Sequence, residues 1–300
     1  MLRVTIDAFS GRENPSYVLD GSEARDLLRD VSRRRQGITD VAEGFTGLGL
    51  RGVTVEALSD DTESFGLPER FKVGGGSALD EGGGQELAER LIRGLANASR
   101  VEPTDSPFPV DEGLIYYFLE LLDRPPGSGP ESILDGPQPS PAAPEDVTCF
   151  IERSRFNPGF WNQSGTLLVN NCYNYASNRR TNTFAQPGLG AGHQYTALTC
   201  AAVTKAALAD GCHRRFDCFP ASEAPRRLVA LVVAPGVDYH WYRIHSLAEG
   251  FWGHKPGNTA ARNVDNSLRM ITNPETCDRG PYTEFCGYFY TCLSQANRIR

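Results

Sequence analysis

Hydrophobic and polar residues alternate at the start of the chain, and this alternation predicts short strands. Segments with hydrophobic residues at helical spacing separate some of these strands and predict helices. Apolar residues at helical spacing, such as Leu27, Leu28 and Val31, indicate an amphipathic helix after the second strand. The expected strands are residues 4–9, 16–19 and 49–58, and the expected helices are residues 23–34, 85–98 and 112–123. The sequence therefore predicts an N-terminal accessory α/β domain over residues 1–123.

Residues 124–146 break this pattern. Seven of these 23 residues are proline, and glycine and serine fill much of the remainder. Such a composition is typical of a semi-extended tether and not of a packed element. We expect a linker here, with a second domain over residues 147–300.

The second half changes from helical periodicity to strands. A short helix is expected after Asn170-Asn171, and the run of apolar residues before Pro235 reads as a buried strand. The expected helices are residues 172–178 and 194–209, and the expected strands are residues 227–234, 238–245, 251–255 and 282–290. The predicted fold class is therefore α+β, with a cysteine-bearing helix packed on an antiparallel sheet.

The strands over residues 238–245 and 251–255 predict a hairpin centred near Ala248. In that register Tyr242 lies opposite His254. Because side chains alternate along a strand, His240 shares the face of Tyr242 and is the diagonal neighbour of His254. Two histidines are thus expected on one face of the hairpin.

Composition narrows the classes of function. The net charge of −7 over 300 residues, without a basic stripe, argues against nucleic-acid binding. No apolar run reaches membrane-spanning length, so no membrane partner is expected. The N-terminus reads as a strand and not as a signal peptide, which predicts a cytoplasmic protein. No cofactor is expected, and the oligomeric state is left open.

All eight cysteines and all five histidines lie at or after Cys149, so thiol and imidazole chemistry is expected in the second half. Without a signal peptide, reduced thiols are the default expectation. Cys277, Cys286 and Cys292, near the C-terminal strand, remain candidates either for pairing or for packing.

Cys172 is the candidate nucleophile. Asn170 or Asn171 can cap the helix that follows, which places the thiol in the first turn. Unpaired amides and the helix dipole favour a thiolate there. His240 would serve as the general base and His254 would orient its ring.

Further residues complete this hypothetical site. Its oxyanion donors would be the Cys172 amide and a nearby amide such as Gln163. Asn258 and Asp265 are rival residues for orienting His240. The expected substrate groove is lined by residues of the hairpin and of the glycine-rich loop: Trp241, Tyr242, Gln186 and Gly188.

The order of Cys172 at a helix start, His240 on a strand and His254 on the next strand resembles the papain-like superfamily. The likeness covers residues 148–300 and is nearest to the NlpC-type and CHAP branches. It implies a papain-like domain and a cysteine-dependent hydrolase or acyl transferase, a thiol peptidase or amidase acting on a peptide or peptide-like substrate. The segment Asn171–Ala176, together with Asp238–Arg243 and His254–Gly257, also resembles motifs of uncharacterised bacterial proteins, which implies no known activity.

Non-enzymatic alternatives remain open. Cys172 and His240 can be buried core residues instead of catalytic ones. A binding module would use an aromatic surface made of Tyr239, Trp241, Tyr242, Phe251 and Trp252. A metal-stabilised domain would use Cys212, His213 and Cys218, although a disulfide-held loop from Cys212 to Cys218 explains the same residues.

Overall fold

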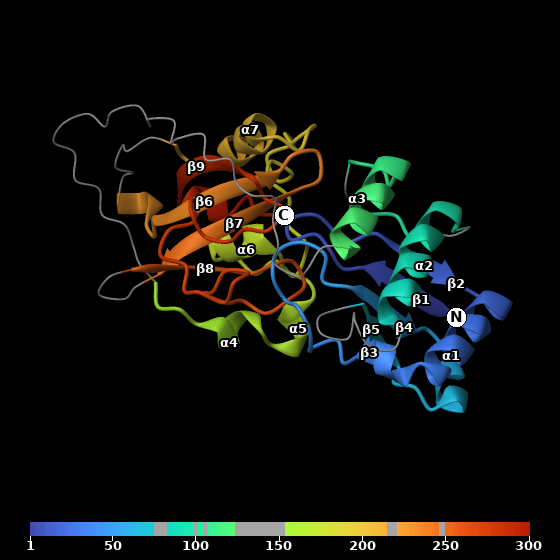
Figure 1. The fold of residues 1–300 in the computed structure, drawn as a ribbon. Helices are drawn as coiled ribbons and strands as arrows, with labels where there is room; N and C mark the ends of the chain where they lie inside the picture. The colour runs from blue at the N-terminus through green and yellow to red at the C-terminus, as the bar shows by residue number, and fades with distance from the viewer. Residues whose placement is uncertain (75–82, 99–100, 105–106, 124–153, 215–220, 246–249) are drawn as a thin grey trace. The chain divides into compact units, whose positions relative to one another are not determined.

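A computed structural model describes residues 1–74, 83–98, 101–104, 107–123, 154–214, 221–245 and 250–300. The chain forms two compact units (Figure 1). The N-terminal unit comprises Met1–Phe9 and Glu13–Ser128, and the C-terminal unit comprises Ser10–Arg12 and Gly129–Arg300. The expected linker over residues 124–146 lies outside the described residues.

The N-terminal unit is built on a five-stranded antiparallel sheet with the order β2-β1-β4-β5-β3. Its strands are β1 (Leu2–Ile6), β2 (Ser16–Leu19), β3 (Ile38–Thr39), β4 (Val53–Ala57) and β5 (Arg70–Val73). Its helices are α1 (Gly21–Arg33), α2 (Gly84–Asn97) and α3 (Glu112–Leu122), with short 3-10 turns at Arg35–Gly37 and Asp60–Phe65. The three predicted helices are confirmed, whereas β3 and β5 were not expected.

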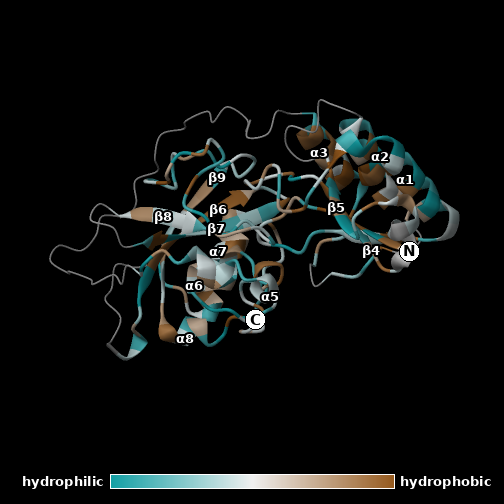
Figure 2. Cartoon of the chain, turned by 90° about the horizontal axis from the view of Figure 1, so that it is seen from below, coloured by the Kyte–Doolittle hydropathy of each residue, from teal (hydrophilic) through white to brown (hydrophobic). Residues whose placement is uncertain are grey.

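Hydrophobic burial explains the helices of this unit. Leu27, Leu28 and Val31 of α1 are buried, as their spacing requires. Helix α3 is coloured mainly as hydrophobic in Figure 2, and it packs against α2. Tyr116 on its other side is 65% exposed, so α3 has one buried side and is not enclosed all round.

The C-terminal unit contains a four-stranded antiparallel sheet with the order β8-β7-β6-β9. Its strands are β6 (Arg227–Ala234), β7 (Asp238–His245), β8 (Phe251–His254) and β9 (Glu284–Thr291). Its helices are α4 (Pro158–Trp161), α5 (Ser164–Leu167), α6 (Cys172–Ser177), α7 (Cys200–Asp210) and α8 (Leu293–Ala296), with a 3-10 turn at Ala221–Glu223. Helices with antiparallel sheets confirm the predicted α+β class.

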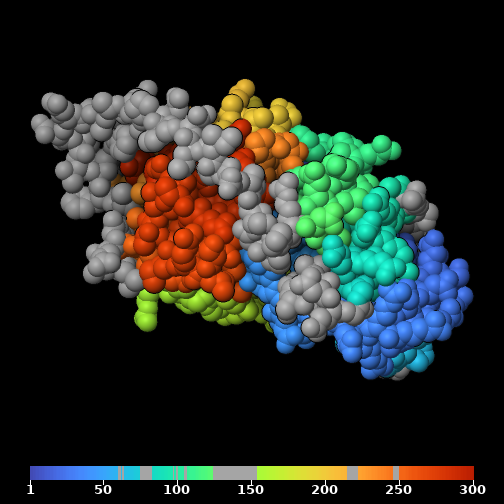
Figure 3. Space-filling view, in the orientation of Figure 1, coloured from blue at the N-terminus to red at the C-terminus, as the bar shows by residue number. Residues whose placement is uncertain are grey.

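Strand β7 lies inside the C-terminal unit, because all eight of its residues are buried. Helix α6 packs against it, and β6 and β8 flank it within the sheet (Figure 1). In the space-filling view, the C-terminal part of the chain, coloured orange to red, forms most of the visible face of this unit (Figure 3). The candidate site residues on β7 are therefore core positions.

Two local features refine the prediction. The helix expected over residues 194–209 begins at Cys200, because the Thr199 side chain caps it by accepting the Ala202 N–H at 3.3 Å. Gly211 then ends it with a φ of 108°, which favours glycine. No helix in the described part of the chain has both the length and the hydrophobicity needed to cross a bilayer.

Candidate functional site

Helix α6 begins where the sequence predicts, and Asn171 is its N-cap. The Asn171 side chain accepts the N–H groups of Tyr173 and Asn174, each at 3.1 Å. In return the Asn174 side chain accepts the Asn171 N–H at 3.0 Å, which completes a reciprocal capping box. Cys172 therefore lies in the first helical turn.

The environment of Cys172 is nevertheless wrong for a reactive thiolate. The residue is 0% exposed, and its thiol points to the Tyr239 carbonyl at 3.9 Å. Burial raises the pKa of the Cys172 thiol well above its ordinary value, and the Asp238 carboxylate raises it further. The prediction of a low-pKa cysteine is wrong, because desolvation exceeds the effect of the first-turn amides.

The Cys172 amide is also engaged. Its N–H donates to the Ser10 carbonyl at 3.4 Å, so it is not directed at a substrate oxygen. Gln163, the other expected oxyanion donor, is exposed and accepts a hydrogen bond from Arg180 at 3.4 Å. The expected pair of oxyanion donors is not assembled at Cys172.

The hairpin register is confirmed. Tyr242 pairs with His254, as predicted, and Ile244 pairs with Trp252. This register brings His240 Nε2 to 2.9 Å from His254 Nδ1, so the expected diagonal pair is a direct contact.

All four nitrogens of these two imidazoles lie close to polar atoms. His240 Nδ1 is 3.0 Å from Ser10 Oγ, and His254 Nε2 is 3.0 Å from the Val264 carbonyl. The remaining two nitrogens contact one another. Both rings are buried, so His240 is a satisfied core residue and is not available as a base.

Sequence reasoning missed Ser10, which contacts His240 from outside the hairpin, and the carboxylate that holds Ser10. The Asp238 carboxylate accepts the backbone N–H groups of Ser10, Gly11 and Arg12, at 2.6, 3.2 and 3.1 Å. Tyr282 donates to the same carboxylate at 2.5 Å. The turn composition of Ser10–Arg12 was visible in the sequence, but no local signal connects it to a carboxylate 228 residues away.

The rival orienting residues lie elsewhere. Asp265 accepts the N–H groups of Arg269 and Asp278, at 2.9 and 3.0 Å, and so organises its own loop. The Asn258 side-chain oxygen is buried without a hydrogen-bond partner in the described part of the chain. Neither residue has a hydrogen bond to His240 among those found in the described residues.

The expected substrate groove is also absent from these positions. Trp241 and Tyr242 are 0% and 1% exposed. Gln186 donates to Gly11 and Phe184 carbonyls, and the Gly188 N–H donates to Asp210 at 2.6 Å. These residues pack the interior of the C-terminal unit.

The aromatic surface of the binding hypothesis is not a surface. Every one of its members is at most 5% exposed: Tyr239, Trp241, Tyr242, Phe251 and Trp252. The prediction is wrong because every residue of the central strand β7 is buried, and so is every residue of its edge neighbour β8.

The metal alternative finds little support at its named residues. Cys212 is a buried free cysteine, so the alternative of a Cys212–Cys218 disulfide is wrong. Cys218 lies outside the described residues. His213 pairs through its backbone with Tyr290. No group of three potential metal-binding side chains occurs within the ranges that the structure describes.

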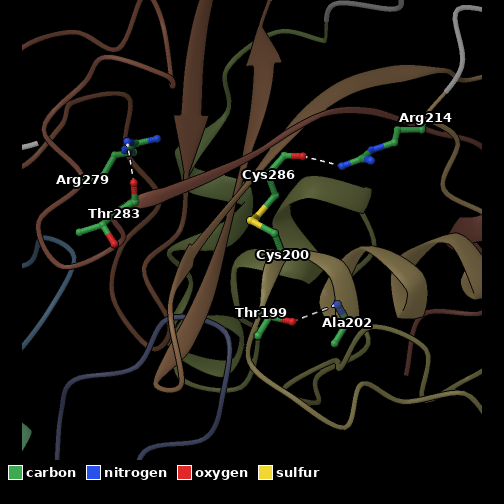
Figure 4. The surroundings of a disulfide bond; sticks show 7 residues. All are labelled: Thr199, Cys200, Ala202, Arg214, Arg279, Thr283 and Cys286. Atoms are coloured by element: carbon green, nitrogen blue, oxygen red, sulfur yellow. Dashed lines mark hydrogen bonds between the residues drawn. A yellow bond between two sulfur atoms is a disulfide. The ribbon is translucent and has the colours of Figure 1, made fainter. Parts of the chain in front are cut away.

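A disulfide joins α7 to β9 in the C-terminal unit (Figure 4). It links Cys200 to Cys286, which are 86 residues apart in sequence. Cys277 and Cys292 are free, as is Cys172. The default expectation of reduced thiols is wrong for the Cys200–Cys286 pair.

Comparison with known proteins gives an independent result. Insoluble matrix shell protein 1 of the mollusc Ruditapes philippinarum is 46% identical to this chain over 136 residues. The aligned part is 45% of this chain and 88% of that protein. No family model and no solved structure matches the chain.

This result overturns the resemblance to papain-like enzymes. The similar protein is a shell matrix protein and not a peptidase, and it comes from a mollusc and not from a bacterium. The predicted cysteine hydrolase or acyl transferase is therefore wrong, as is the bacterial assignment. The shared order of Cys, His and His is explained by core packing.

Proposed function

The chain belongs to the family of insoluble matrix shell protein 1, and from this premise we propose that it is a secreted, non-enzymatic structural protein of an insoluble extracellular matrix. The observation that carries the proposal is the 46% identity, which extends over 88% of that protein. Its partners are then other matrix components and not peptide substrates.

The interior of the C-terminal unit supports a structural role. The segment Asn170–Ala176, which attracted a catalytic interpretation, is buried at every position. Tyr173 donates to Asp210 at 2.8 Å, and Tyr175 contacts His245 Nε2 at 2.5 Å. Each asparagine and tyrosine of this segment has a partner inside the fold, which is how buried polar networks specify one packed arrangement.

The disulfide supports secretion. Structural disulfides persist in oxidising compartments and are rare in the cytosol. Cys200–Cys286 connects a helix to a strand that lies 86 residues later in the sequence, so it crosslinks the fold and not a local loop. The proposal therefore replaces the cytoplasmic location expected from the N-terminal sequence.

We further propose that residues 1–123 and 147–300 are separate domains joined by residues 124–146. The aligned length of 136 residues is close to the size of one such domain and far from that of the whole chain. On this proposal the chain combines a family domain with a second domain.

Fractionation of the source organism's matrix tests the proposal. The matrix is extracted first with aqueous buffer and then with denaturant and reductant, and peptides are mapped by mass spectrometry. We expect peptides from both halves of the chain in the fraction that resists aqueous extraction, with a cytosolic enzyme as the fractionation control. Recovery of the chain with that cytosolic control overturns the proposal.

A further inference from the structure

The turn between α4 and α5 contains the tripeptide Asn162-Gln163-Ser164, which has the form of an N-glycosylation acceptor. Such a tripeptide is Asn, any residue except proline, and then Ser or Thr. Only one other tripeptide in the sequence satisfies this form, Asn97-Ala98-Ser99. Asn14-Pro15-Ser16 does not, because proline occupies its middle position.

The backbone presents this tripeptide at the surface. Asn162 is partly exposed, and Gln163 and Ser164 are exposed. Helix α4 ends just before Asn162 and α5 begins at Ser164, so the acceptor occupies a turn and not a helix interior. The yellow-green segment that contains α4 and α5 is visible at the lower edge of the C-terminal unit in Figures 1 and 3.

Buried neighbours hold the turn in place. Trp161 is 1% exposed and packs with Tyr175 and Ala261. The Asn162 N–H donates to the Pro158 carbonyl at 2.9 Å. The acceptor residue therefore directly follows a buried residue of the core.

The two polar atoms of the Asn162 side chain differ in their hydrogen bonding. Its Oδ1 atom accepts the Ala261 N–H at 2.8 Å. No hydrogen bond within the described residues engages Nδ2, and Nδ2 is not among their buried polar atoms that lack a partner. The oxygen anchors the side chain, and the nitrogen is neither hydrogen-bonded within these residues nor fully buried.

We propose that Asn162 carries an N-linked glycan on Nδ2, an inference that rests on the proposed secretion of the chain. The donor is an oligosaccharide activated as a lipid-linked diphosphate. The Nδ2–C1 bond forms, the bond from C1 to the diphosphate oxygen breaks, and the diphosphate leaves with the electron pair. One amide proton is lost, and the Oδ1 bond to Ala261 is retained in the product.

Three other asparagines in the neighbouring sequence lack the properties that a glycosylation acceptor needs. Asn170, Asn171 and Asn174 are all 0% exposed and are held by internal hydrogen bonds. None of them begins an Asn-x-Ser or Asn-x-Thr tripeptide. Asn162 combines the sequence signal with a partly exposed side chain.

The test uses the full chain with a cleavable secretory leader, translated in the presence of microsomal membranes. An Asn97→Gln background removes the second tripeptide. Only protease-protected chains are scored, so every scored chain has met the glycosylation enzymes. We expect one endoglycosidase-sensitive mobility step and conversion of Asn162 to Asp by peptide N-glycosidase.

Two variants of Ser164 provide the matched comparison. Ser164→Ala removes the required hydroxyl but leaves the Asn162–Ala261 hydrogen bond, and we expect it to abolish the mobility step. Ser164→Thr keeps the signal and should retain the step. Protease-protected chains with unmodified Asn162 overturn the proposal, as does a step that persists in Ser164→Ala.

The leader makes this result independent of the chain's natural location. An unmodified Asn162 in translocated chains refutes the glycan and leaves the matrix proposal standing. Recovery of the natural protein from the cytosol refutes the matrix proposal even when Asn162 accepts a glycan in microsomes.

Discussion

His240 Nε2 lies 2.9 Å from His254 Nδ1, across the neighbouring strands β7 and β8. The two rings meet edge to face, with centroids 5.0 Å apart. Tyr242 packs against both, with ring centroids 4.8 and 5.1 Å from those of His240 and His254. His254 is favoured as a neutral ring in this core, because burial lowers its pKa.

This burial makes stability depend on pH. Burial, together with a smaller effect of the nearby Arg262 charge, lowers the pKa of His254 from 6.5 to about 3. The unfolded chain therefore binds more protons than the folded chain between these two pH values. Above pH 6.5, His254 does not reduce the free energy of unfolding. As the pH decreases from 6.5 toward 3, the free energy of unfolding falls, and at pH 5 the loss due to His254 is about 2 kcal/mol.

Denaturant unfolding at several pH values measures this effect. We expect His254→Gln to be less stable than the natural chain at pH 7 and to lose less stability on acidification. His193→Gln is the control, because His193 is exposed. If the natural chain and His254→Gln show parallel pH profiles, His254 is not a buried neutral imidazole.

The Cys172 thiol should resist alkylation in the folded protein. It is 0% exposed and its pKa is raised by burial, so both access and thiolate formation are disfavoured. Iodoacetamide treatment followed by peptide mapping should leave Cys172 unmodified under native conditions and label it in denaturant. Cys277 is the internal comparison, because it is free and partly exposed. Native labelling of Cys172 at its denatured rate would show that the core opens.

Elements specified by nearby residues were predicted well. Strands β6 and β7 have the predicted bounds, and β7 pairs with β8 in the predicted register across a connection of five residues. Asn171 similarly fixes the start of α6 through bonds to residues two and three positions later. In each case the information that determines the structure lies within one short window of sequence.

The chemistry of the candidate site depended on distant residues. Position in a first helical turn favours a thiolate. However, Cys172 contacts the backbone carbonyls of Ser10 and Tyr239, which lie 162 positions before it and 67 positions after it in the sequence. The exposure of β7 could likewise not be predicted, because the sequence of the hairpin does not show which other elements pack against it. Sequence alone thus gave the partners of His240 within the hairpin and missed Ser10.

Asp238→Asn should destabilise the C-terminal unit strongly. The carboxylate accepts three consecutive backbone N–H groups, from Ser10 to Arg12, and an asparagine amide would present N–H groups to some of these donors. The variant loses hydrogen bonds to a charged group and leaves buried N–H donors unpaired. We therefore expect the free energy of unfolding to fall by about 3 kcal/mol or more.

Unfolding in denaturant measures that loss. Asp26→Asn is the matched control, because Asp26 forms an exposed pair with Arg29 and should change stability by less than about 0.5 kcal/mol. Equal stabilities for the two variants would mean that the Ser10–Arg12 contact contributes little to the fold.

The Cys200–Cys286 disulfide should contribute more to stability than any single hydrogen bond in this unit. It closes a loop of 86 residues, and the loss of chain entropy in the unfolded state predicts about 4–5 kcal/mol. The double variant Cys200→Ala with Cys286→Ala should lower the denaturation midpoint accordingly. Cys277→Ser is the control, because Cys277 is free and its replacement breaks no covalent link. If the double variant unfolds at the midpoint of Cys277→Ser, the crosslink adds no stability, and the fold is held by the sheet and by the Asp238 contacts alone.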